Sequence, residues 1–166
     1  MIKKLLVAID ASEAAAGAVA AAEQVALQVN ADVVLLHVIE IASFAAADGV
    51  HRFQPTSEEL RQAGNELLSR TRARMDNDLR VSLLLLEGET AETIISTAKL
   101  CDADLIVIGT DSRGRLAHFI LGSTADSVIR RAGCPVLAVR RGVGQLDRVK
   151  ACSAGVVATR CARSFG

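Results

Sequence analysis

Five short apolar runs constrain what this chain can fold into more than any other feature. Each is a nearly continuous stretch of Val, Ile and Leu, and together they cover residues 5–9, 33–39, 81–86, 105–108 and 136–139. Strands that are apolar on both faces are typical of a parallel sheet whose two sides are covered by helices. The runs therefore predict a five-stranded parallel sheet.

The stretches between these runs have a helical period. Apolar or small residues recur every three or four positions in four stripes: Ala18, Ala22, Val25 and Val29; Leu60, Ala63, Leu67, Thr71 and Met75; Ile94, Ile95, Ala98 and Cys101; and Ala125, Val128, Ile129 and Ala132. Alternation of strand and helix predicts a single α/β domain, doubly wound, with helices on both faces of the sheet. Aromatic residues make up only 2% of the chain, so the core is expected to be aliphatic.

Local signals set the expected element boundaries. Ser12 is expected to cap the first helix, Thr56 with Glu59 forms a candidate capping box, and Ser123 with Asp126 has a similar pattern. Residues 41–55 form a connection longer than most in α/β units, which predicts a lid or a partly disordered segment. We place the domain at residues 1–141 and treat residues 142–166 as a C-terminal tail of unknown structure.

The candidate binding segment follows the fourth predicted strand. Gly109 ends that strand, and Gly122 and Ser123 open the next helix. A glycine there permits close backbone approach to a ligand, and a helix N-terminus offers free N–H groups and a partial positive charge to a phosphate. If strands one and four are neighbours, Asp10 faces Gly109 across the crevice where ligands bind in doubly wound sheets. This arrangement suggests a nucleotide site.

Several other function classes find little support. The spacing of Gly109 and Gly114 fits a P-loop, but Arg115 and Leu116 replace its lysine and its magnesium ligand. The first strand lacks a dinucleotide-binding glycine pattern. Balanced charge and few aromatics argue against a nucleic-acid partner. No apolar stretch is long enough for a signal peptide or a membrane helix, so the protein is expected to be cytoplasmic, with reduced cysteines. Neither cysteine nor histidine spacing suggests a metal site.

Catalytic patterns are also missing from the sequence. The three histidines have no neighbouring nucleophile in a recognisable arrangement, and no carboxylate pair is set up for acid–base chemistry. His37 is expected to be a partly buried strand histidine with a local hydrogen bond. We therefore expect a protein that is not an enzyme.

Four segments in the right order and spacing resemble the universal stress protein family. They are LLVAIDAS, LLHVIE, GETAETIISTAKLCDADLIVIGT and LGSTADSVIRRAGCPVLAVR, and the resemblance covers roughly residues 1–141. The ATP-binding branch of that family carries G-x2-G-x9-G-[ST] after its fourth strand. Counted from Gly109, the motif places Gly122 and Ser123 correctly and puts Ser112 where the family has glycine.

The resemblance implies a fold of the adenine nucleotide alpha hydrolase type and a bound ATP or AMP, with Mg²⁺ as a candidate companion ion. Asp10 would then contact the adenosine, although it also suits a simple turn, and Val38 would lie against the adenine, although it belongs to the core in either case. The phosphates would meet Gly109, Ser112, Gly122 and Ser123. Arg113 is a candidate for neutralising phosphate charge, unless it stays solvated as loop arginines usually do.

The family likeness also bears on partners. It implies a homodimer, and the last predicted strand, from Pro135 to Arg140, would otherwise be an unprotected apolar edge that a twofold mate could pair with. A regulatory protein partner, not identifiable from the sequence, would detect the bound state. Two alternatives stay open: a nucleotide-free dimeric interaction module that has lost the site, for which Ser112 is the evidence, and a weak ATPase.

Overall fold

The computed structural model describes residues 1–40, 56–110, 122–140 and the backbone of 157–159. Strands and helices alternate along the chain as β1 (Lys4–Ala8), α1 (Glu13–Val29), β2 (Asp32–Ile39), α2 (Ser57–Arg74), β3 (Val81–Glu87), α3 (Thr90–Leu100), β4 (Leu105–Thr110), α4 (Ser123–Arg131), β5 (Val136–Arg140) and β6 (Val157–Thr159). The predicted loop at 41–55, together with Ser112 and Arg113, lies outside the described residues.

The first five strands form the predicted parallel sheet, and its order is β3-β2-β1-β4-β5-β6. β1 is hydrogen-bonded to β2 on one side and to β4 on the other, so the winding reverses between β1 and β4. This confirms the doubly wound α/β fold, in which strands one and four are neighbours. The sequence did not reveal β6, which comes from the tail and pairs antiparallel with β5.

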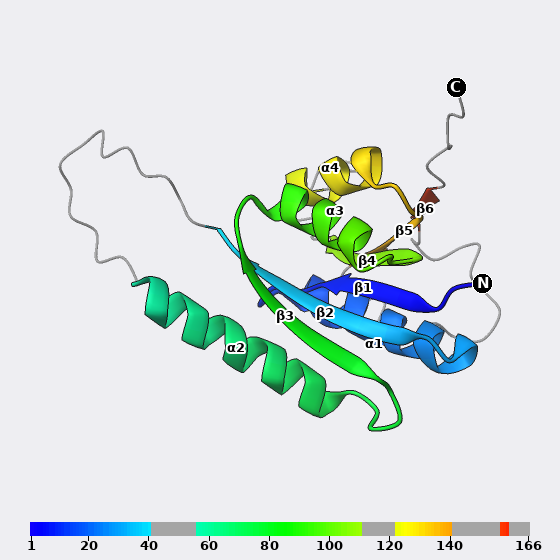
Figure 1. Cartoon of the computed structure of the whole chain (residues 1–166), viewed down its shortest axis with the longest axis horizontal. Helices are drawn as coiled ribbons and strands as arrows, with labels where there is room; N and C mark the ends of the chain where they lie inside the picture. The colour runs from blue at the N-terminus through cyan, green and yellow to red at the C-terminus, as the bar shows by residue number, and fades with distance from the viewer. Residues whose placement is uncertain (41–55, 111–121, 141–156, 160–166) are drawn as a thin grey trace.

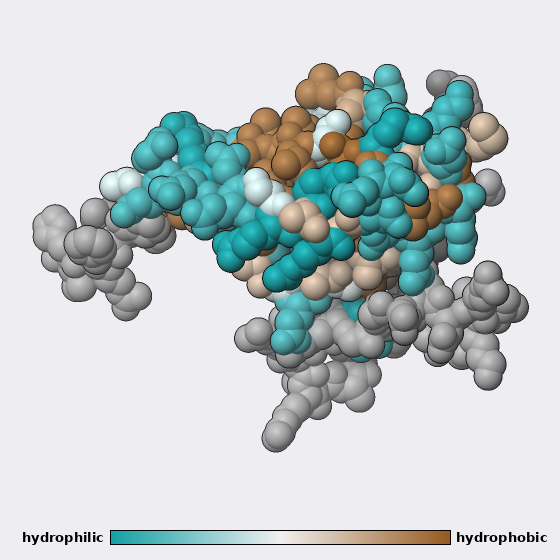
Figure 2. All heavy atoms as spheres, turned by 90° about the horizontal axis from the view of Figure 1, so that it is seen from below, coloured by the Kyte–Doolittle hydropathy of each residue, from teal (hydrophilic) through white to brown (hydrophobic). Residues whose placement is uncertain are grey.

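The helices lie on both faces of the sheet (Figure 1). Two layers of aliphatic side chains hold them there. On the side of α1 and α2, alternate strand residues such as Leu5, Leu35 and Val107 pack against the alanines of α1. On the opposite side, Leu36 and Ile106 belong to the layer beneath α3 and α4. Alternation of side chains along each strand assigns successive residues to opposite layers, which is why the strands are apolar without interruption. Seen from below, the described surface is largely hydrophilic, with a hydrophobic patch among the polar residues (Figure 2).

Helix starts follow the predicted caps in two cases and not in the third. Ser12 Oγ accepts a hydrogen bond from the backbone N–H of Ala15 at 3.1 Å, and Thr56 with Glu59 forms a complete capping box. The expected cap at Ser123 is wrong: Gly122 is the N-cap of α4, and no side chain caps that helix. Asp126 instead accepts a hydrogen bond from Arg130 at 2.8 Å, so it is not available to close the first turn.

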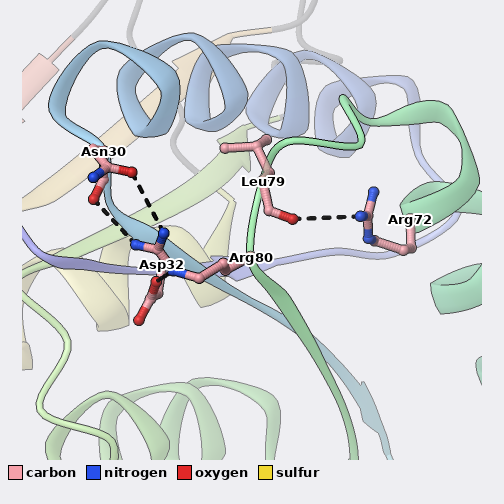
Figure 3. A network of polar contacts seen from close by, with 5 residues as sticks. All are labelled: Asn30, Asp32, Arg72, Leu79 and Arg80. Carbon is pink, nitrogen blue, oxygen red and sulfur yellow. Dashed lines mark hydrogen bonds and ion pairs between the residues drawn. The ribbon is translucent and has the colours of Figure 1, made fainter.

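The edge of the sheet where the strands begin is tied by polar contacts (Figure 3). Arg80 donates to the carboxylate of Asp32 at 2.5 Å and to the backbone oxygen of Asn30 at 3.4 Å, at the end of α1. Arg72 in α2 donates to the backbone oxygen of Leu79 at 3.4 Å. These contacts fix the connections at this end, whereas the ends of the strands open onto a cavity. Within the described ranges, no helix is both long and apolar enough to cross a membrane.

Candidate functional site

A cavity of about 530 Å³ lies at the carboxyl ends of the parallel strands, at the point where the winding reverses. Of the residues predicted for the site, it is lined by Asp10, Val38, Gly109, Gly122 and Ser123. The five come from β2, β4, α4 and the turn after β1, so the fold brings together residues that are far apart in the sequence. Ser112 and Arg113 cannot be placed, because they lie outside the described residues.

Asp10 occupies the turn between β1 and α1. Its Oδ1 accepts a hydrogen bond from the backbone N–H of Ser12 at 2.9 Å, and the Ser12 side chain in turn caps α1. The turn role and the binding role considered for this residue are therefore compatible. One oxygen orients the carboxylate, and among the described residues Oδ2 has no partner.

One wall of the cavity is aliphatic. Leu36 and Val38 come from β2, Ile94 from α3 and Ile108 from β4, and all four line the space. Val38 is half-buried and packs against the layer beneath α3 and α4. It is thus a core residue whose exposed part faces the cavity. A flat apolar group such as a purine ring fits against a surface of this kind.

Glycine is required at position 109 for a packing reason that differs from the predicted close approach to a ligand. A Cβ on this residue would lie 2.5 Å from the carbonyl carbon of Ala14 and 2.7 Å from the backbone nitrogen of Ala15. These atoms belong to the first turn of α1, and backbone cannot move aside as a side-chain tip can. The glycine is therefore needed so that α1 can lie close to β4, and it lines the cavity in addition.

Gly122 has no such restriction. Its φ of −55° and ψ of 151° are open to any residue, and a Cβ built on it meets no described atom within 4 Å. Its value to the site is the missing side chain, because the first turn of α4 faces the cavity with no side-chain cap in the described structure. Ser123 and Thr124 line the cavity at the same end and add two hydroxyl groups.

Five further polar residues line the cavity that the sequence analysis did not assign to it: Ser12, His37, Glu40, Thr90 and Thr110. The Thr90 hydroxyl donates to Glu40 Oε1 at 2.5 Å, which connects the end of β2 to the start of α3. Thr110 is buried and donates to the backbone oxygen of Val139. Their positions at or shortly after the ends of predicted strands could have identified them, since any residue following a parallel strand is a candidate for lining the crevice.

His37 is the partly buried strand histidine that was expected. Its Nδ1 lies 2.9 Å from the backbone oxygen of Ile9, so Nδ1 carries the proton and donates. The contact holds the ring at the end of β1. Among the described residues, no group of three His, Cys, Asp or Glu side chains that could hold a metal ion is found.

The charge along the cavity is uneven. Its described lining includes the carboxylates of Asp10 and Glu40 but no Lys or Arg. Positive potential comes from the N-terminus of α4, whose free N–H groups carry a partial positive charge. The negative charge of Asp126, in the first turn of α4, would weaken this potential, but an ion pair with Arg130 offsets that charge. The hydrogen bond from Arg130 also lowers the pKa of Asp126. The cavity is thus acidic at the ends of β1 and β2 and suited to an anion at α4.

Comparison with known proteins settles the family. The universal stress protein family model matches residues 1–140. The chain belongs to the universal stress protein family. A universal stress protein of Methanocaldococcus jannaschii is 30% identical over 142 residues, which is 85% of this chain and 84% of the relative.

Solved structures agree with the fold. A universal stress protein family structure from Burkholderia pseudomallei is 28% identical, with a TM-score of 0.65, and the match covers 83% of this chain and 96% of that one. A universal stress protein from Archaeoglobus fulgidus, in complex with dAMP, is 24% identical with a TM-score of 0.60, covering 84% of this chain and 98% of that one. At that identity the likeness shows the shared fold.

Proposed function

We propose that this universal stress protein binds an adenine nucleotide, ATP or AMP, in the cavity at the carboxyl edge of the sheet. We further propose that it acts as a cytoplasmic stress-response regulator and does not turn the nucleotide over. The observation that carries the proposal is the combination of chemistry in one cavity: an apolar wall, two carboxylates and a helix N-terminus with no side-chain cap. A base, a ribose and a phosphate need those three surroundings.

The sheet gives the ligand its direction. Neighbouring strands lie about 4.8 Å apart, so the ends of β2 and β4, with β1 between them, are separated by about 10 Å. A nucleoside with its first phosphate spans such a distance. The base would lie on Val38 near the end of β2, the ribose hydroxyls would donate to Asp10, and the phosphate would accept from the first turn of α4.

The opposite direction is electrostatically unfavourable. A phosphate near the end of β2 would face Glu40 and Asp10 with no described cation to offset them. Glu40 is better suited to the base end, where a carboxylate accepts a hydrogen bond from the exocyclic amine of adenine. The dAMP bound by the Archaeoglobus fulgidus protein supports the ligand class by analogy of fold. Mg²⁺, if it accompanies ATP, would be held mainly by the phosphates and water.

The test is to purify the full chain, denature it and identify any released nucleotide by mass spectrometry. Calorimetric titration with ATP and AMP, with and without magnesium, follows on the same preparation. A Cβ on Gly122 meets no described atom within 4 Å, so Gly122→Val places a branched side chain at the α4 N-terminus, and binding is expected to fall at least tenfold while folding is kept. Gly133→Val is the matched control, because Gly133 has equally open surroundings at the other end of α4.

Two rival functions have specific outcomes. A nucleotide-free interaction module, favoured by Ser112 and by the acidic lining, predicts no copurified nucleotide and no heat at millimolar ligand. A weak ATPase predicts phosphate release well above the rate without protein.

The proposal also includes two protein partners. One is a second copy, which would form a homodimer through the strand from Pro135 to Arg140, and this dimer requires that β6 leave this edge. The other is a protein that recognises the nucleotide-bound state.

A further inference from the structure

The outer edge of β5 is already paired in this chain. Val136, Leu137 and Ala138 lie opposite Thr159, Ala158 and Val157 in an antiparallel ladder. The family match ends at residue 140, so β6 comes from a part of the chain that the family model does not match. The strand that covers the edge is thus an addition to the family domain.

Without β6, this edge would be a strong pairing surface. Val136, Ala138 and Val139 are 2%, 2% and 1% exposed, so β5 is buried on both faces and held in an extended conformation by β4. An ordered strand with a row of unpaired N–H and C=O groups accepts another strand readily. The strand that fits here runs antiparallel, as β6 does.

We propose that the outer edge of β5 is an interaction surface for which β6 and the β5 strand of a second copy compete. Two β5 strands related by a twofold axis are antiparallel, so a second copy would present the same direction of pairing that β6 presents. Both strands need the same backbone groups of residues 136–138, and they cannot be bound together. The inference rests on the dimer part of the proposed function and adds that β6 regulates dimer formation.

The two competitors differ in length and in concentration. β6 offers three residues, Val157–Thr159, whereas a second β5 offers five, Val136–Arg140. The tail strand, however, is joined to the same chain and meets the edge at an effective concentration on the order of millimolar. At micromolar protein the tail therefore wins and the full chain is a monomer. Weakening β6 should transfer the edge to a second copy.

The experiment compares full-length chains by sedimentation equilibrium across the micromolar range. The test variant is Val157→Pro/Thr159→Pro, and Ala158→Pro is a second one, so that whichever residues donate to β5 lose their N–H groups. Ala151→Pro/Ser164→Pro is a control with the same number of prolines in the tail outside β6. We expect monomers for the natural chain and the control, and a dimer for at least one β6 variant.

Two results would overturn the proposal. A natural chain that is already dimeric at low micromolar concentration would mean that β6 does not hold the edge. Monomeric β6 variants, with their cooperative thermal unfolding intact, would mean that the edge does not accept a second copy.

Hydrogen exchange supplies an independent reading. In the β6 variants, protection of the β5 amides should rise with protein concentration, whereas in the natural chain it should not change. Protection that is independent of concentration in both would contradict the competition. Nucleotide titration of the same samples keeps this inference separate from the binding proposal. A chain that binds no nucleotide still gives a valid comparison of oligomeric states. A chain whose oligomeric state does not change can still bind nucleotide.

Discussion

The backbone of Ala14 lies 2.5 Å from the position that a Cβ on Gly109 would occupy. This approach connects the first turn of α1 to the end of β4, and both elements line the cavity. The residue that most resembles a ligand-contact glycine in the sequence is therefore first a packing residue. Any side chain there must move α1 away from the sheet.

Gly109→Ala should destabilise the fold by about 1–3 kcal/mol, the usual range for overpacking a core. The cost arises because a methyl group would overlap main-chain atoms of Ala14 and Ala15. Urea unfolding followed by circular dichroism measures it. Gly133→Ala is the control, since a Cβ there meets nothing within 4 Å. Equal stabilities for the two variants would show that α1 adjusts freely.

Glu40→Gln should reduce the preference for adenine over guanine nucleotides. A carboxylate accepts from the amine of adenine and repels the carbonyl oxygen of guanine, whereas an amide can donate as well as accept. The measurement is the ratio of dissociation constants for AMP and GMP in the natural chain and the variant. We expect the ratio to fall by about tenfold, since one hydrogen bond to a charged group contributes about 1.5 kcal/mol.

Thr90→Val distinguishes the orientation of the Glu40 carboxylate from its recognition of the adenine base. It removes the hydroxyl that donates to Glu40 Oε1 and keeps the volume of the side chain. AMP affinity should weaken while the preference for adenine is retained, because the carboxylate stays in place but is less fixed. Unchanged selectivity in Glu40→Gln would instead show that Glu40 only joins β2 to α3.

The layered fold could be predicted because its signal is periodic and repeated. Runs such as 33–39 and 105–108 are too apolar for any strand that faces water, and the stripes of α1 and α3 fit helices covering them. The stripes were less accurate at helix ends: Val29 was placed on the buried stripe of α1 but is 41% exposed. β6 had no periodic signal, since three residues among small neighbours match no repeat.

The candidate site could be predicted only in part. Asp10 and Gly122 follow strand ends or open a helix, which local sequence reveals. Glu40 and Thr90 belong to two different strand–helix junctions, and only the pairing of β2 with β3 brings them together. The reason for Gly109 was also hidden, because the atoms that exclude a side chain belong to another helix.

Asp104 provides a pH-dependent contribution to stability at the opposite edge of the sheet. Its carboxylate accepts from the backbone N–H groups of Lys3 and Lys4, at 2.7 and 3.1 Å, and the Lys3 contact is the main cause of its lowered pKa. A carboxyl group whose pKa is lower in the folded state stabilises the fold above its unfolded pKa. That stabilisation is lost as the pH falls through the folded pKa.

The comparison is between the natural chain and Asp104→Asn, which keeps one acceptor oxygen and removes the charge. The melting temperature of the natural chain should exceed that of the variant at pH 7, and the difference should shrink below about pH 4. Thermal unfolding at a series of pH values measures it. A difference that stays constant with pH would show that the hydrogen bonds do not depend on the charge.

Ser112→Gly tests the one departure from the family's nucleotide motif. If serine at this position has to adopt a positive φ, it costs about 1–2 kcal/mol, and glycine removes that cost. AMP and ATP affinity should then rise about fivefold or more. Ser112→Ala is the matched control, because it also lacks the hydroxyl but keeps the Cβ. A gain in Ser112→Gly alone identifies backbone strain as the cause, whereas a loss in both variants shows that the serine hydroxyl bonds to the phosphate and that the departure is an adaptation of the site.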